Sequence, residues 1–163
     1  MRRARLLCVV GVGLCWAVAT GHQAASPTEL SGALRAHVKE ERFGVVTSIR
    51  GLPLGVREAL QTLFASSWLD IAEPGEGFQA TGASIRSRVP SRRLVAAGCS
   101  SDHCLVYYER GGSAHTWHVA LFHWTPAETR FEWGAVAPGG LATIGDVRIA
   151  ILSGEIKTPA QSW

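Results

Sequence analysis

Apolar and polar residues alternate in four short runs between positions 93 and 136, which is the pattern of half-buried β-strands. The runs cover residues 93–99, 104–110, 115–124 and 130–136. The connectors SSDH, GGSA and TPAET have the lengths of β-hairpin loops. This part of the chain therefore predicts a four-stranded antiparallel meander.

On the N-terminal side of these runs, apolar residues recur at helical spacing. Residues 27–42 and 53–66 each predict an amphipathic helix, and the apolar stretch 43–49 between them has the length of a strand. Residues 70–92 are rich in Gly, Pro and Ser, and predict a long irregular connection. A connection of this length usually covers something or contributes to a site.

The end of the chain, residues 141–156, fits a helix that Thr143 and Asp146 would cap, although its second half also alternates as a strand would. We expect the helix. The predicted fold is therefore α+β: a four-stranded antiparallel β-meander with one or two N-terminal helices and a C-terminal helix packed on the sheet.

The loop lengths also predict which strand residues lie opposite one another, provided that SSDH and GGSA each turn as four-residue loops and TPAET as a five-residue loop. Opposed residues point to the same face of a sheet. The predicted pairs are Cys99 with Cys104, Val95 with Tyr108, Tyr108 with Trp117, Val106 with Val119, Leu121 with Trp133, and His123 with Phe131.

This register predicts one apolar face, which we expect a helix to cover, and one mixed face. The mixed face would carry a row of small residues that lets another body approach closely. That body is either the N-terminal helix of the same chain or a partner. The candidate binding residues on the mixed face are Tyr107, His118, Phe122, Trp124, Arg130 and Glu132.

The N-terminus predicts a secretory signal peptide over residues 1–19, with three arginines before an apolar run and the small residues Ala17 and Ala19 at the expected cleavage site. An uncleaved anchor is the alternative. Residues 20–26 predict a flexible tail, and residues 27–163 a single domain. We therefore expect an exported protein, periplasmic or secreted, with no membrane association beyond export.

Removal of the predicted signal peptide, the leader, would change both the net charge and the cysteine content of the chain. The three arginines of the leader account for the whole net charge of +3, so the remaining chain has no basic excess that would attract nucleic acid. Two cysteines remain, Cys99 and Cys104, in an oxidising compartment. Their predicted opposition in a hairpin favours a structural disulfide over a metal-binding or redox pair.

The histidines do not predict a metal site. His115, His118 and His123 are separated by odd numbers or by eight residues, so strand geometry places them on opposite faces or far apart. His103 falls in the first turn, with no other histidine predicted beside it. We accordingly expect neither a metal ion nor another cofactor.

No nucleophile, zinc-protease or phosphate-loop motif occurs in the sequence. The favoured function is therefore a binding module that meets a protein or a cell-envelope component on the mixed face and the 70–92 connection. The alternative is an exported enzyme, such as a hydrolase, using His118 with Glu132 and Tyr107. Metal binding is the third possibility.

Overall fold

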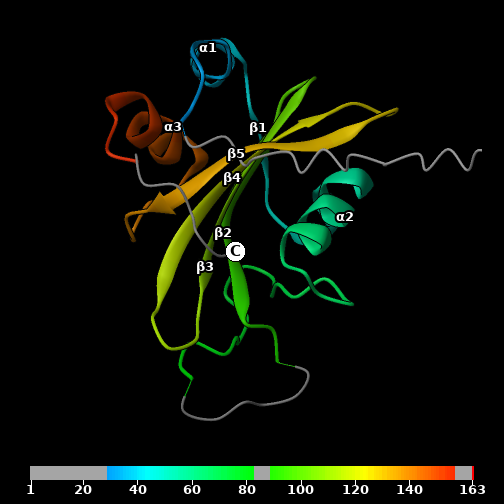
Figure 1. Cartoon of the computed structure of the whole chain (residues 1–163), viewed down its shortest axis with the longest axis vertical. Helices are drawn as coiled ribbons and strands as arrows, with labels where there is room; N and C mark the ends of the chain where they lie inside the picture. The colour runs from blue at the N-terminus through cyan, green and yellow to red at the C-terminus, as the bar shows by residue number, and fades with distance from the viewer. Residues whose placement is uncertain (1–28, 83–88, 157–162) are drawn as a thin grey trace, which may run out of the picture.

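The computed structural model describes residues 29–82, 89–156 and 163, and it confirms the α+β class. Within these residues one antiparallel sheet has the strand order β1-β2-β3-β4-β5 (Figure 1). Four strands form the predicted meander, and a short N-terminal strand adds a fifth at the β2 edge. The strands are β1 (Gly44–Val46), β2 (Arg92–Cys99), β3 (His103–Arg110), β4 (Thr116–Trp124) and β5 (Thr129–Ala137). The predicted signal peptide and tail lie outside the described residues.

The helices occupy the expected parts of the chain, with different ends. They are α1 (Gly32–Glu40), the short 3-10 helix η1 (Ile49–Gly51), α2 (Leu54–Leu63) and α3 (Ile144–Ser153). The first helix begins later than predicted, because Ser31 caps it by accepting a hydrogen bond from the Leu34 N–H. The predicted capping box of Thr143 and Asp146 is present on α3, so the helical interpretation of this segment is confirmed.

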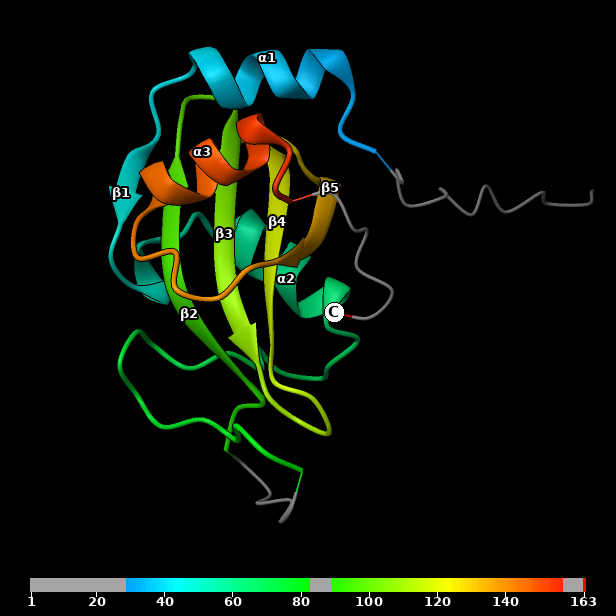
Figure 2. The ribbon, with the colours of Figure 1, turned by 90° about the vertical axis from the view of Figure 1, so that its left-hand side faces the viewer.

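The helices lie on both faces of the sheet (Figures 1 and 2). Two apolar cores result, one under α1 and α3 and one under α2. The α1–α3 core contains Val38, Leu105, Tyr107, Val119, Leu121, Trp133, Ala135, Ala137, Ile144, Val147, Ala150, Ile151 and Ile156. The α2 core contains Ile49, Leu52, Val56, Leu60, Phe64, Ile71, Leu94, Ala97, Cys104, Val106, Tyr108, Ala120 and Phe122.

The predicted register holds at the first hairpin, where Cys99 lies opposite Cys104 and Ala97 opposite Val106. The expected Cys99–Cys104 disulfide is present. Beyond Ala96 the prediction is wrong, because an irregularity between Leu94 and Ala96 places Leu94, and not Val95, opposite Tyr108.

Between β3 and β4 the prediction is wrong by one residue. Val106 lies opposite Ala120, and Tyr108 lies opposite His118. The turn contains five residues, 111–115, because the pair of strand residues that flanks it is Arg110 with Thr116. Long-range backbone hydrogen bonds hold this wider turn: the Gly111 N–H donates to the Ser91 carbonyl, and the Gly112 carbonyl accepts from the Gly82 N–H.

The last hairpin keeps the predicted pair of Leu121 with Trp133, but a second irregularity places Phe122, and not His123, opposite Phe131. Side chains alternate between faces along a strand. The one-residue shift therefore turns every side chain of β4 and β5 to the face opposite the predicted one, relative to the side chains of β2 and β3. The single apolar face predicted from sequence does not exist. Both faces are apolar, and helices cover both.

Candidate functional site

Tyr107, His118 and Glu132, which the alternative enzyme function would need at one site, lie apart in the structure. Tyr107 lies in the α1–α3 core, where its hydroxyl donates a 2.6 Å hydrogen bond to the Pro138 carbonyl. His118 is opposite Tyr108 and therefore points to the α2 side of the sheet. Glu132 lies at neither place, since it pairs with Arg130 and His103. The three side chains do not form one site.

His118 is a buried aromatic neighbour of Tyr108. Its ring stacks on the Tyr108 ring at 5.4 Å, and its Nε2 lies 2.9 Å from the Thr116 hydroxyl. Burial, followed by the charges of Arg110 and Arg92, lowers the pKa of His118 to about 4. The imidazole is therefore neutral near pH 7, which suits its place in the α2 core.

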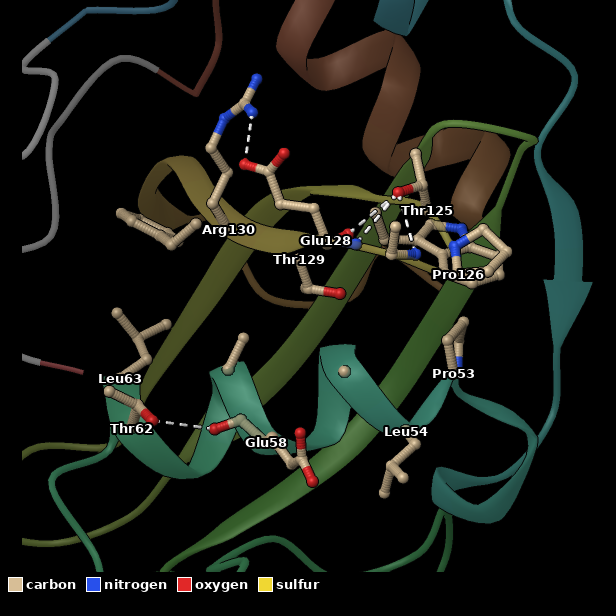
Figure 3. Close-up of a pocket in the computed structure, with 15 residues that line it drawn as sticks. Pro53, Leu54, Glu58, Thr62, Leu63, Thr125, Pro126, Glu128, Thr129 and Arg130 are labelled. Carbon is tan, nitrogen blue, oxygen red and sulfur yellow. Dashed lines mark hydrogen bonds and ion pairs between the residues drawn. The ribbon is translucent and has the colours of Figure 1, made fainter.

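The other candidates lie on the α2 side or at its rim. Phe122 is fully buried in the α2 core. Trp124 and Arg130 line an open groove of about 700 Å³ between α2 and the β4–β5 hairpin (Figure 3). The charged and polar groups of the hairpin wall bond to one another, as Arg130 does with Glu128 and Thr125 with the Glu128 backbone. The groove thus presents no buried, unpartnered polar atom among the described residues.

A different group of side chains gathers at the end of the sheet under α1. His103 begins β3 and lies directly opposite His123 of β4, with ring centroids 5.5 Å apart. Glu132 of β5 reaches the same place, and its Oε2 lies 3.4 Å from His103 Nε2. The expectation that His103 has no histidine beside it is wrong, because it depended on the register that the five-residue turn shifts.

Two further side chains reach this cluster from α1. The His37 ring packs at a tilt against the His103 ring with centroids 4.3 Å apart, and Glu41 Oε1 lies 2.9 Å from His103 Nδ1. Arg148 of α3 fixes this end of α1, since its guanidinium donates to the backbone carbonyls of Val38, Lys39 and Glu41. We refer to His37, Glu41, His103, His123 and Glu132 as the histidine–carboxylate cluster.

The contribution of α1 was not predicted from the sequence. The only local signal is the spacing of His37 and Glu41, which are four residues apart and so share one side of a helix. Their contact with His103 spans more than sixty positions and depends on how α1 packs across the sheet. No periodicity along the chain encodes that packing.

The two carboxylates of the cluster differ in how their oxygens are bonded. Glu41 Oε1 contacts His37 Nδ1 at 2.5 Å as well as His103, and Glu41 Oε2 accepts from the Ser100 hydroxyl. Burial raises the pKa of Glu41, but the hydrogen bonds from Ser100 and His37 and the charge of His103 outweigh it and lower the pKa. Glu41 is therefore an ionised and fully bonded acceptor.

Glu132 is not fully bonded. Its Oε1 accepts from Arg130 Nε and Nη2, whereas its Oε2 is buried and has no hydrogen-bond partner among the described residues. His103 Nδ1 contacts the Glu41 carboxylate, so the ring presents its other nitrogen, Nε2, to Glu132 Oε2. A proton on Nε2 makes this 3.4 Å contact an ion pair, whereas a ring without that proton offers Nε2 as a ligand that can bind a cation together with Glu132 Oε2.

Three side chains of this cluster could hold a metal ion. One ligand atom from each of His103, His123 and Glu132 lies within 4.8 Å of the other two. Two ligands at about 2.1 Å from a tetrahedral zinc ion are about 3.4 Å apart, which is the separation of His103 Nε2 and Glu132 Oε2.

Within residues 29–82, 89–156 and 163, no helix is both long enough and apolar enough to cross a membrane. Comparison with protein-family models, with curated proteins and with solved structures finds no match to this chain. Its function is therefore inferred from its own residues.

Proposed function

We propose that this protein is an exported domain that binds one divalent transition-metal ion of the zinc class through His103 Nε2, His123 and Glu132 Oε2. Two imidazoles and one carboxylate form a ligand set that zinc commonly takes. The observation that carries the proposal is that ligand atoms of His103, His123 and Glu132 lie within 4.8 Å of one another, and that the buried Oε2 of Glu132 accepts no hydrogen bond from a described residue and lies 3.4 Å from His103 Nε2.

The surroundings of His103 support the same assignment. A histidine that binds a metal usually donates its other ring N–H to a carboxylate, which fixes the tautomer and makes the ligand nitrogen more basic. Glu41 holds this position on His103 Nδ1, and Ser100 and His37 in turn hold Glu41. Because His103 is only 4 % exposed, the ring is already oriented before any ion binds.

The sequence favours binding of a protein or a cell-envelope component on the mixed face, and the structure gives that surface less support. Of the residues chosen for that partner surface, Tyr107 and Phe122 are buried in two different cores, and His118 is buried beside Tyr108. The described parts of the 70–92 connection lie at the end of the sheet opposite α1 and pair with β2 and the Gly112 turn (Figure 2). The residues are therefore not arranged as one continuous contact surface.

The test is a zinc titration of the purified, chelator-treated protein without a histidine tag, followed by calorimetry. We expect one ion per chain, and we expect Glu132→Gln and His123→Asn to abolish this binding step. His115→Asn is the matched control, because His115 pairs with the carboxylate of Glu109 at 2.8 Å outside the cluster. Equal binding by Glu132→Gln and the wild-type protein, or no saturable binding by the wild-type protein, would overturn the proposal.

A further inference from the structure

Four members of the histidine–carboxylate cluster, all except Glu41, form part of the wall of an open cavity of about 580 Å³ between α1 and the ends of β4 and β5. A zinc ion with three protein ligands usually keeps a fourth position for water or an exogenous ligand. We infer that the ion keeps such a position open toward this cavity, and that the position takes a small carboxylate anion. The inference rests on the proposed function, since it needs the ion to be bound.

Arg130 supplies the second contact for the anion. Its side chain lines the same cavity and is 54 % exposed. The hydrogen bonds to Glu128 and Glu132 use one N–H from each of its three nitrogens. A guanidinium has five N–H groups, so two N–H groups of Arg130 form no hydrogen bond with a described residue. One carboxylate oxygen would bind the ion while the other accepts from Arg130.

The rest of the cavity limits the kind of carboxylate. Leu34 of α1 and Phe131 of β5 form an apolar part of its wall, which suits a short aliphatic or aromatic group attached to the carboxylate. Asp102 also lines the cavity and carries a like charge, but it is exposed and solvent screens it. A compact monoanion therefore fits better than a multiply charged anion such as phosphate.

The alternative fourth ligand is His37. Its ring lies 4.3 Å from that of His103 and lines the cavity, while its Nδ1 is bonded to Glu41. In the structure this bond holds His37 beside Glu41, on the Nδ1 side of His103, whereas Glu132 Oε2 lies on the Nε2 side. His37 therefore belongs to the support of Glu41, and the fourth position stays available.

The test uses cobalt(II), which takes zinc sites and absorbs visible light, whereas zinc is spectroscopically silent. Cobalt-saturated protein is titrated with acetate and, separately, with azide, which binds metals through one atom. We expect both anions to change the absorption spectrum saturably. Arg130→Gln should raise the acetate dissociation constant about tenfold and leave that of azide much less affected. Arg50→Gln, which removes an exposed arginine outside the cavity, is the matched control.

The outcomes separate this inference from the proposed function. Failure of cobalt(II) and zinc to bind at all overturns the proposed function, and this inference with it. Stoichiometric cobalt binding with a spectrum that neither anion changes overturns the open position alone. If His37→Ala then creates an anion response, His37 is the fourth ligand. An acetate response that Arg130→Gln leaves unchanged overturns the assignment of Arg130 and of the carboxylate.

Discussion

His103 and His123 are directly opposed residues on neighbouring antiparallel strands, with ring centroids 5.5 Å apart. This pairing exists because the β3–β4 turn contains five residues. With a four-residue turn, His103 would lie opposite Phe122 and the two imidazoles would point to opposite faces of the sheet. The metal site that we propose therefore depends on one residue in a turn at the far end of the same hairpin.

Glu41→Gln should weaken zinc binding by about 10–100-fold without removing it, because Glu41 orients His103 and raises its basicity but does not touch the ion. Competition with a chromogenic chelator measures the affinity. Glu40→Gln, at an exposed neighbouring position on α1, is the control and should bind zinc as the wild-type protein does. An unchanged affinity in Glu41→Gln would show that the carboxylate on Nδ1 has no role in binding.

Removal of the disulfide should lower both stability and metal affinity. Cys99 and Cys104 close a short loop, for which chain entropy predicts a loss of about 2 kcal/mol in the free energy of unfolding. The same loop carries Ser100 and His103, whose contacts with Glu41 would loosen. Urea unfolding and zinc titration of the Cys99→Ala, Cys104→Ala double variant measure the two effects. Two free thiols in an unfolded, unreduced chain that lacks residues 1–19 would contradict the disulfide.

Acidification should destabilise the protein through His118. The pKa of His118 is about 4 in the folded protein and 6.5 in the unfolded chain, so the unfolded chain binds more protons between these pH values. The free energy of unfolding should therefore fall as the pH drops from 6.5 to 4, by on the order of 3 kcal/mol. His118→Phe keeps an aromatic ring beside Tyr108 and should remove this part of the pH dependence. Urea unfolding of metal-free protein at pH 7 and pH 4.5 measures it, and identical slopes in both proteins would contradict it.

Gly134→Ala should destabilise the protein by about 1–3 kcal/mol, because an added methyl group would overpack its surroundings. A Cβ at this position would lie 2.2 Å from the Trp163 ring and 2.8 Å from the Val119 carbonyl oxygen. Trp163 also contacts the rings of Phe131 and His118. The cost should be smaller in a Trp163→Ala background, where only the backbone contact remains. Thermal unfolding of the four proteins of this cycle measures the coupling, and strict additivity would show that Trp163 does not limit the space at Gly134.

The parts of the fold that were predicted correctly depend on contacts between residues close together in the chain. The capping box of Thr143 and Asp146, the SSDH hairpin and the pairing of its two cysteines each involve a few consecutive residues. Turn chemistry and helix propensity act over the same short range. The candidate site could not be predicted in this way, since its ligands come from three strands and its support from α1.

The sequence by itself determined the kinds of elements, their order and the disulfide, because alternation, helical spacing and short loops are local properties. Tertiary structure decided the register of β3 with β4, through hydrogen bonds of the Gly111–Gly112 turn to Ser91 and Gly82. It also decided that α2 covers the face that sequence analysis left open, and that Glu41 reaches His103. Each of these contacts joins distant parts of the chain, and its free energy depends on the packing of the whole domain.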